Sequence, residues 1–380
     1  MESLLIKNGS LVSPVNGYRR DEADILVKNG RIEKIGRNLE AEDGMQVVDA
    51  SGCIVTPGLI DIHTHCYPRA FLGLAPDTLG IERGATTILD AGSSGADNYE
   101  DFRENYIEKS KTKVFTLLNI SKEGLIRGHE LDAPEKIDIP ALERTIEKYS
   151  DNIVGLKARA SASVVGKMGL KPIAIAAETA EKTGKPLMVH VGNYPPALTD
   201  VLNLLGKGAV VTHAYHGKKG GILTEEGHII PEAIQARERG VLFDIGHGVA
   251  SFSLKVFRKA LAEGFDCDLI GTDLHVENYE GPVYNLAAVL SKAVGCGEAL
   301  EDAVEKCTSA PARHFGLTGL GELKPGATAD LNIMEFAGCE DEVEDSIGDK
   351  MVLRKKLVLK KTIYSRGENS EIFEHVAGKQ

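Results

Sequence analysis

Residues 53–65 read Cys-Ile-Val-Thr-Pro-Gly-Leu-Ile-Asp-Ile-His-Thr-His, an apolar run that ends in two histidines one residue apart. A strand alternates its side chains between two faces, so His63 and His65 point to the same side and can bind one ion together. A Val- and Ile-rich run that enters such a pair is typical of a buried parallel strand, whose carboxyl end carries the chemistry in barrel enzymes. The alternative for an isolated pair is two histidines in an ordinary loop, so the interpretation depends on the rest of the chain.

Length and composition favour a small-molecule partner. The 380 residues suffice for one barrel of about 250 residues plus a smaller domain. The net charge is −12 and there is no basic block, which argues against nucleic acid and anionic membranes as partners. No apolar run approaches the roughly 20 residues of a membrane span, and the first residues do not form a signal core, so we expect a cytoplasmic protein. These features leave a homo-oligomer open.

The six cysteines are scattered without Cys-x-x-Cys spacing, which argues against a disulfide framework or a structural zinc site. Cys66 directly follows His65 and is a candidate soft metal ligand, but alternation directs its side chain to the opposite face of the strand. We therefore expect most cysteines to be small buried residues.

Both ends of the chain read as short strands. The pairs Asn8-Gly9 and Asn29-Gly30 follow apolar runs near the start, and Asn-Gly between such runs predicts a hairpin because both residues tolerate the positive φ of a tight turn. Similar apolar runs recur after residue 320. The simplest arrangement is one discontinuous β-sandwich domain built from residues 1–57 and 316–380.

The middle of the chain, residues 58–315, alternates short apolar runs with helical stretches, the pattern of repeated βα units around a parallel sheet. Eight runs qualify as strands, centred on residues 59–61, 86–90, 114–118, 153–157, 186–190, 209–213, 241–245 and 268–273. Eight units in this span predict an α/β fold, a (β/α)8 TIM-like barrel. A doubly wound open sheet is the alternative, but no Gly-x-Gly-x-x-Gly follows an early strand, and that fold would disperse the histidines.

Several predicted strands end in a residue that can bind metal. These residues are His63, His65, Lys157, His190, His213 and Asp273. Strand ends from distant parts of the sequence meet at one rim of a barrel, so we expect these side chains to lie together. Each has an ordinary explanation alone, such as a core-edge histidine or a helix-capping carboxylate. Their joint occurrence at strand ends indicates a metal centre.

This set of residues resembles the amidohydrolase superfamily, in the subgroup whose two metal ions are bridged by a carboxylated lysine. The resemblance implies that His63, His65 and Asp273 bind the more buried ion. His190 and His213 would bind the more exposed ion, and Lys157 would be the bridging carbamate. An ammonium could not sit between two cations, whereas a lysine that has taken up carbon dioxide is an anion with two oxygens. Zinc is the expected metal because imidazole and carboxylate ligands suit it.

The resemblance also implies the chemistry. Two divalent ions that share a water lower its pKa and supply hydroxide, and the exposed ion polarises the substrate carbonyl. Asp273 would take the proton during attack and pass it to the leaving group, so it is the predicted catalytic residue.

Other polar residues beside the strand ends are candidates for substrate contact. Arg159, two residues beyond Lys157, can bind a carboxylate through paired hydrogen bonds, and a salt bridge with a neighbouring loop is the alternative. The remaining candidates follow the fifth to eighth predicted strands: Asn193, Tyr215, His216, His247 and His275.

Differences from the motifs of related enzyme families narrow the range of possible reactions. Purine and pyrimidine deaminases carry His-x-x-Glu after the fifth strand, where this chain has Asn193, and dihydroorotases carry His-x-His-x-Arg, where this chain has Tyr67. The pattern resembles a dihydroorotase-like branch, some members of which hydrolyse acetyl esters of α-hydroxy acids. We expect metal-dependent hydrolysis of an amide or ester in a small carboxylate-bearing molecule, such as an N-acyl amino acid or O-acetyl hydroxy acid. Cyclic amide hydrolysis is the closest alternative; a deaminase or a non-catalytic scaffold is less favoured, since no metal ligand is missing.

Overall fold

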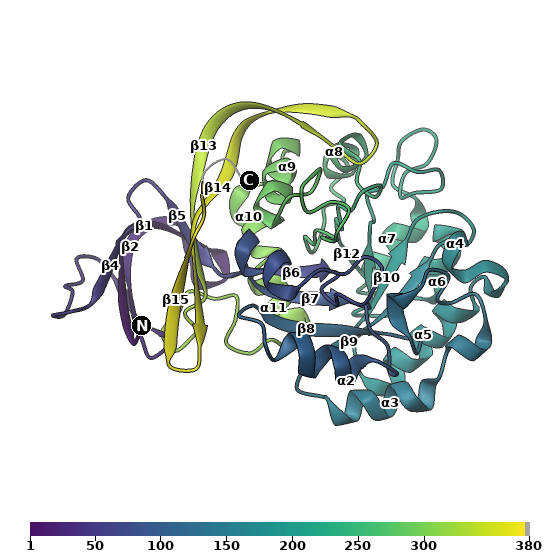
Figure 1. Cartoon of the computed structure of the whole chain (residues 1–380). Coiled ribbons are helices and arrows are strands. Elements are labelled where there is room, and N and C mark those ends of the chain that lie inside the picture. The colour runs from purple at the N-terminus through teal and green to yellow at the C-terminus, as the bar shows by residue number, and fades with distance from the viewer. Residues whose placement is uncertain (377–380) are drawn as a thin grey trace.

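The barrel contains seven parallel strands that pair in the order of the sequence (Figure 1). The computed structural model describes residues 1–376. The barrel strands are β6 (Leu59–Thr64), β7 (Ala85–Ala91), β8 (Lys113–Asn119), β9 (Ile153–Ala160), β10 (Leu187–Val191), β11 (Val210–Thr212) and β12 (Leu242–Phe243). Each overlaps one of the predicted apolar runs, and the predicted barrel is confirmed.

The segment predicted as the eighth strand, residues 268–273, closes the barrel without forming a regular strand. Single parallel bridges join Leu269 to Asp244 and Leu274 to Thr64. The prediction of a regular strand here is therefore wrong, although the closure that it implied is present.

Two buried carboxylates explain this irregular segment. Asp61 accepts hydrogen bonds from the backbone N and the hydroxyl of Thr272 (3.0 and 2.6 Å), and Asp244 accepts one from the backbone N of Gly271 (2.6 Å). These bonds replace part of a strand ladder. Asp273 then adopts φ of 55°, in the left-handed region, so the backbone leaves strand geometry where this residue enters the barrel mouth.

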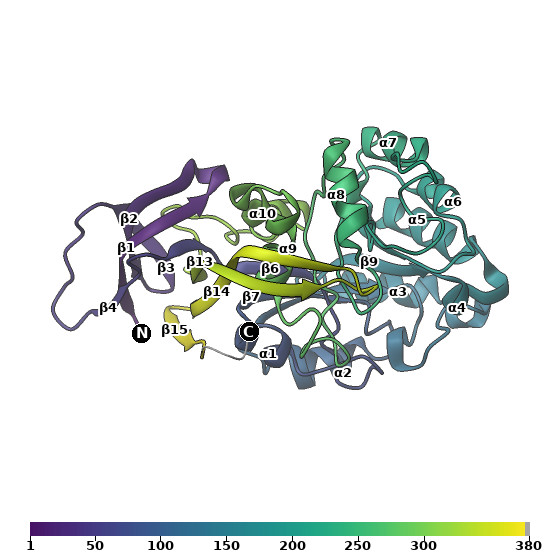
Figure 2. The same cartoon turned by 90° about the horizontal axis from the view of Figure 1, so that it is seen from above.

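Helices cover the outside of the barrel (Figure 2). In α5 (Lys171–Thr183), Pro172 occupies the first turn, where a backbone N–H has no helical partner, and Gly184 ends the helix with φ of 65°. Ile173 and Ala176 lie on its buried face. The other α-helices are α1 (Pro76–Leu79), α2 (Tyr99–Phe102), α3 (Ile139–Lys148), α4 (Ala162–Val165), α6 (Leu198–Leu204), α7 (Pro231–Glu238), α8 (Leu254–Ala262), α9 (Leu286–Cys296), α10 (Leu300–Glu305) and α11 (Ser309–His314).

The two ends of the chain form a second, eight-stranded sheet beside the barrel (Figure 1). Its strands are β1 (Ser3–Ser13), β2 (Tyr18–Lys28), β3 (Arg31–Gly36), β4 (Gln46–Asp49), β5 (Ile54–Pro57), β13 (Leu331–Glu344), β14 (Lys350–Arg366) and β15 (Asn369–Glu374). Strand β5 pairs with both β1 and β13, so it joins the two ends of the chain. The sheet surrounds its own apolar core, which includes Leu4, Ile25, Val55, Ile333 and Ile363.

One of the two predicted Asn-Gly turns is present. Asn29 and Gly30 both have positive φ (52° and 69°) and connect β2 to β3. The turn predicted at Asn8-Gly9 is wrong, because β1 continues through these residues with an irregular register. Asn8 has φ of 60°, and its backbone N–H donates to Asp24 Oδ1 (2.9 Å). The Asp24 side chain on the neighbouring strand thus satisfies an N–H that the irregular register leaves without a backbone partner.

Strands β13 and β14 form a long hairpin that leaves the terminal sheet and arches over the barrel (Figures 1 and 2). We call residues 344–350 the hairpin tip. The tip is bonded to the loop before α8: Leu254 N donates to Asp345 Oδ2 (2.8 Å), and Ser346 N donates to Phe252 O (3.1 Å). The sequence prediction placed short strands here and missed the reach of this hairpin across the barrel mouth.

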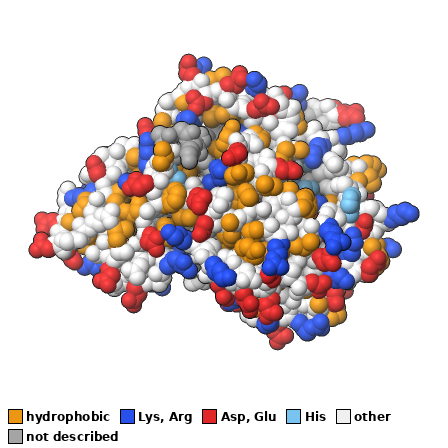
Figure 3. Space-filling view, in the orientation of Figure 1, with side chains coloured by type: hydrophobic (Ala, Val, Ile, Leu, Met, Phe, Trp, Pro, Cys, Tyr) orange, Lys and Arg blue, Asp and Glu red, His pale blue; other side chains and the backbone are white. Residues whose placement is uncertain are grey.

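The surface mixes acidic, basic and apolar side chains, as Figure 3 shows for one face. Lys and Arg on that face are interspersed with Asp and Glu. Within residues 1–376, no helix combines the length and the apolar character needed to cross a membrane.

Candidate metal centre

The six residues predicted as metal ligands meet at the carboxyl ends of the barrel strands: His63, His65, Lys157, His190, His213 and Asp273. Asp273 Oδ1 lies 3.3 Å from His63 Nε2 and 3.1 Å from His65 Nε2. Its Oδ2 lies 3.8 Å from His213 Nε2. The ring of His190 packs edge-on against that of His213, with centroids 4.3 Å apart. The barrel thus gathers into one cluster residues that span more than 200 positions of the sequence.

Lys157 lies inside this cluster and is fully buried. Its Nζ is 2.9 Å from His63 Nε2 and 3.4 Å from Met188 Sδ. Burial lowers the pKa of Lys157 to about 7. An amine with such a pKa is neutral in a large fraction of molecules near neutral pH, and the neutral amine is the nucleophilic form of lysine.

A chain of hydrogen bonds fixes the tautomer of His63. The Thr212 hydroxyl donates to Asp244 Oδ2 (2.6 Å), so it accepts a hydrogen bond from His63 Nδ1 (2.8 Å). The proton of His63 therefore lies on Nδ1, and the lone pair of Nε2 faces Lys157 and Asp273. Partners of this kind orient ligand histidines in metal sites.

The other two inward-facing rings are held in the same way. His65 Nδ1 contacts Ser93 Oγ (3.0 Å), and His213 Nδ1 donates to Gly246 O (2.5 Å). A carbonyl only accepts, so His213 Nε2 carries a lone pair that points into the cluster. His190 differs, because its Nε2 contacts Ser161 Oγ (3.1 Å).

The donor set fits a divalent metal ion. His213 Nε2 is buried and has no hydrogen-bond partner among residues 1–376, a costly state that a bound cation would relieve. Ligand atoms of His63, His213 and Asp273 all lie within 4.8 Å of one another. Burial lowers the pKa of His63 well below its usual value and that of His213 to about 3, so both rings are neutral, the form that binds metal.

Asp273 supplies the negative charge of the cluster. Burial opposes its ionisation, but His63, His65 and His213 around it hold the pKa of Asp273 well below its usual range. The carboxylate is therefore ionised at neutral pH. It can bind a cation and accept a proton from a group that the cation activates.

Arg159 and Glu130 form a salt bridge beside the cluster. Arg159 Nε is 2.8 Å from Glu130 Oε1, and Glu130 is only 3% exposed. Burial raises the pKa of Glu130, and the Arg159 charge acts in the opposite direction. The loop salt bridge considered from the sequence as the alternative for Arg159 is therefore present.

The three rim histidines predicted for substrate contact have different surroundings. The ring of His275 lies 6.1 Å from that of His65, centroid to centroid, and so borders the cluster. His216 is buried and accepts a hydrogen bond from the backbone N of Lys218 at Nδ1 (3.1 Å). His247 Nε2 is 2.9 Å from Lys292 Nζ. This contact with Lys292 occupies the Nε2 of His247 outside the cluster.

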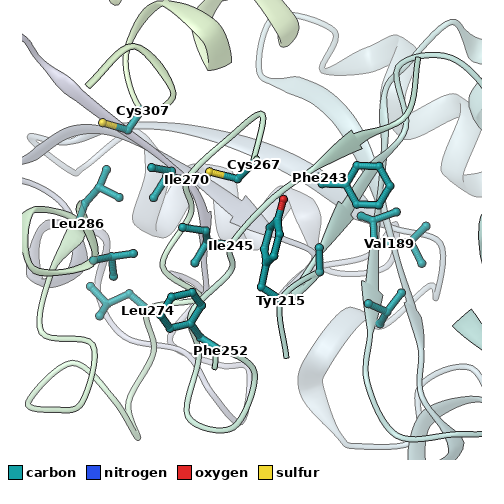
Figure 4. Packing of buried hydrophobic residues seen from close by; sticks show 14 of the residues in the cluster. Val189, Tyr215, Phe243, Ile245, Phe252, Cys267, Ile270, Leu274, Leu286 and Cys307 are labelled. Carbon is teal, nitrogen blue, oxygen red and sulfur yellow. The ribbon is translucent and has the colours of Figure 1, made fainter. Parts of the chain in front are cut away.

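The other two candidates differ in exposure. Tyr215 is fully buried, and Figure 4 shows its ring among the apolar side chains around Phe243 and Ile245. Its hydroxyl is therefore not available to a substrate in the barrel mouth. Asn193 is exposed, and its backbone O accepts a hydrogen bond from Ala162 N (2.9 Å). Cys66 is buried in the core and is not in the cluster.

Sequence reasoning missed two features of the rim. Lys218 lies in the loop after β11 and is half-buried near His213 of the cluster. The hairpin tip packs over the same loop, since a methyl group on Gly217 would lie 2.7 Å from Ile347 Cδ1. No local pattern marks either feature, because both depend on how separate segments of the chain pack together, as Gly217 and Ile347 do.

Comparison with known proteins identifies the group to which this site belongs. Residues 54–365 match the Amidohydrolase family. The chain belongs to the amidohydrolase family. It is similar to a protein named deacetylase from Enterococcus faecalis, with 38% identity over 95% of this chain and 97% of that protein. A protein named deacetylase from Agrobacterium fabrum is 36% identical over 93% of this chain and 88% of its own length.

Solved structures agree with this amidohydrolase fold. A structure described as an adenine deaminase has a TM-score of 0.91 and 36% identity, and the match covers 98% of this chain and 99% of that one. A structure described as a dihydroorotase has a TM-score of 0.91 and 33% identity over the whole of both chains. This amidohydrolase is a hydrolytic enzyme that uses metal to cleave an amide or ester bond, and the metal-binding character of the family agrees with the buried His/Asp cluster.

Proposed function

We propose that this enzyme removes an acyl group, most simply acetyl, from the nitrogen or oxygen of a small carboxylate-bearing molecule such as an N-acetyl amino acid or an O-acetyl α-hydroxy acid. The observation that carries the proposal is the buried cluster of neutral histidines around the ionised Asp273. The names of the two deacetylase relatives, each matched over most of the chain, support removal of an acetyl group.

Two zinc ions and a carbamate on Lys157 complete the proposed centre. His63, His65 and Asp273 would hold one ion, and His190 and His213 the other. The buried amine of Lys157 beside His63 supports the carbamate, since a neutral amine adds carbon dioxide and the product is an anionic bridge. The bound ions would supply an activated water and polarise the substrate carbonyl.

Among the residues of the chain itself, Asp273 carries the proton chemistry. Its carboxylate is ionised and lies between the ligand histidines, so it can accept a proton on one oxygen during attack and return it to the leaving nitrogen or oxygen. Thr212 and Asp244 hold the His63 ring in place while this happens.

A screen of acyl and cyclic substrates tests the proposal. Protein supplied with Zn²⁺ and bicarbonate is assayed against N-acetyl amino acids, O-acetyl α-hydroxy acids and cyclic amides, and the products are identified by mass spectrometry. We expect acetate release from one of the first two groups, and Asp273→Asn should lower its rate by roughly 10²–10⁴-fold.

Cyclic amide hydrolysis is the second candidate. The structural match to a protein described as a dihydroorotase favours it. Ring opening of a cyclic amide without release of acetate would replace the first proposal with the second. Turnover by protein stripped of metal would contradict both.

A further inference from the structure

Lys218 is a positive charge at the site that lacks a partner. It follows β11 by six residues and is half-buried. Within residues 1–376 its Nζ makes no salt bridge and no hydrogen bond. A half-buried ammonium loses hydration, and the Asp273 carboxylate favours its charge without forming an ion pair with it. An anion that arrives there therefore gains a strong interaction.

The position of the Lys218 loop is fixed from two sides. The backbone N of Lys218 donates to His216 Nδ1 (3.1 Å). On the other side Gly217 contacts Ile347 of the hairpin tip. The tip in turn is tied to the barrel through Asp345, which accepts a hydrogen bond from Leu254 N (2.8 Å). The ammonium is therefore presented by a supported loop, as a binding residue should be.

Lys218 and His190 lie close together beside Gly192. A methyl group on Gly192 would lie 2.9 Å from Ser161 Oγ, 3.3 Å from His190 Nε2 and 3.7 Å from Lys218 Nζ. His190 Nε2 and Lys218 Nζ are therefore no more than about 7 Å apart. An α-acyl acid has its acyl group and its carboxylate on neighbouring atoms, so one such molecule can reach both groups at once.

Arg159, the other cation near the cluster, is already neutralised. Its Nε forms a salt bridge with the buried carboxylate of Glu130 (2.8 Å). A substrate carboxylate gains less from a guanidinium that is already paired than from an ammonium that is not, because the pair presents little net charge. Lys218 is therefore a better candidate than Arg159 for the residue that binds the substrate carboxylate.

We propose that Lys218 binds the carboxylate of the substrate and selects anionic over neutral acyl compounds. This inference rests on the proposed function, since it assigns one end of the substrate while the metal ligands act on the other. Lys218 makes an ion pair with the carboxylate, and the short separation of Lys218 from His190 places the acyl group beside His190.

The test compares an acid with its neutral amide. N-Acetylglycine and N-acetylglycinamide, together with O-acetylglycolate and O-acetylglycolamide, share the bond to be cleaved and differ in the charged group. We measure kcat/KM for wild type, Lys218→Met, Lys218→Arg and the control Lys219→Met, with Zn²⁺ and bicarbonate present. Lys219 is the next residue and is exposed, so its variant removes the same charge from the surface instead of the site.

We expect wild type to prefer the acid of each pair. Lys218→Met should lower the ratio of kcat/KM for acid over amide by about 10- to 100-fold, the loss typical of one hydrogen bond between charged groups. Lys218→Arg should recover part of that ratio, and Lys219→Met should leave it within about threefold. An equal loss on acid and amide, or an unchanged ratio, would overturn the assignment.

A binding measurement separates this inference from the proposed function. If wild type hydrolyses none of the four compounds, the proposed acetyl hydrolysis fails, and glycolate binding to zinc-loaded protein is followed by calorimetry. A Kd for glycolate at least tenfold weaker in Lys218→Met than in Lys219→Met still supports Lys218 as a carboxylate-binding residue. Equal affinity in the two variants, or no binding by wild type, would overturn it.

Discussion

Replacement of Gly92 by alanine is expected to displace Lys157 without replacing any of the candidate ligand residues. Gly92 follows β7 and has φ of 83°. A methyl group on it would lie 2.7 Å from Lys157 Cγ and 2.8 Å from Lys157 Cβ. Carbon atoms in contact are ordinarily about 3.5–4.0 Å apart, so the lysine stem has to move by about 1 Å. Its Nζ, now 2.9 Å from His63 Nε2, would move with it.

A displacement of about 1 Å at a reacting centre typically costs about 100-fold in rate. We expect Gly92→Ala to lower kcat by about that factor on the best acetylated substrate and to lower the bound metal content. The left-handed backbone adds a destabilisation of about 1–2 kcal/mol, because alanine is strained at positive φ. Metal analysis, kcat and thermal unfolding measured on the same preparation separate these effects.

Gly208→Ala is the matched control. Gly208 has φ of 85°, close to that of Gly92, and a methyl group on it would meet no atom within 4 Å. This variant should show the same loss of stability with normal kcat and metal content. A Gly92→Ala enzyme that keeps kcat within threefold of wild type, with its fold intact, would refute the reasoning that the Gly92 space positions Lys157.

Three further predictions follow from the same structure. Lys157→Ala should lose most of its bound metal and activity, and added formate or acetate should restore part of both by replacing the bridging anion. Lys157→Arg should show no such rescue. Near-normal turnover of either variant would exclude Lys157 as the bridge. Asp273→Asn should stay folded with some metal bound while kcat falls by roughly 10²–10⁴-fold, the usual effect of losing a general acid–base group; a kcat within tenfold of wild type at full metal loading would place the base elsewhere. Burial lowers the pKa of Lys292 to about 8. The unfolded chain therefore binds more protons at this residue between pH 8 and about 10.5, and wild type should gain stability relative to Lys292→Met over that range, on the order of 3 kcal/mol, in denaturant titrations.

The clustering of the candidate ligand residues could be predicted because each position depends on local sequence and one topological rule. His63 and His65 share a strand face through period-two alternation, and Lys157 and His190 lie in strands that their apolar neighbours reveal. The barrel then places these strand ends at one rim. The position of Asp273 was predicted for the same reason. The residues before it do not form the expected strand, because their backbone N–H groups donate to the carboxylates of Asp61 and Asp244.

The rest of the rim could not be predicted because it depends on long-range contacts. Nothing in the sequence distinguishes Lys218 from Lys219; one points to the site and the other to solvent because of how the loop packs. Tyr215 looked like a rim residue from its place after β11, yet its ring turns into the core. Asn8-Gly9 satisfied the local turn rule, but pairing with β2 carried the strand through it. In each case tertiary packing outweighed the local signal.

The hairpin tip has a consequence for the order in which an active enzyme is made. Residues 58–315, which hold all six candidate ligands, leave the ribosome before the tip that packs on the Lys218 loop and on Phe252. Chains emerge at about 5–20 residues per second, so the barrel has time to form while its mouth still lacks this support. Until β14 has emerged and returned to pair with β13, the nascent chain holds its candidate metal ligands but presents an incompletely packed mouth. Complete packing of the barrel mouth is therefore tied to the last part of translation, and a ribosome stalled near residue 340 would hold a barrel whose Lys218 loop lacks the support of the hairpin tip.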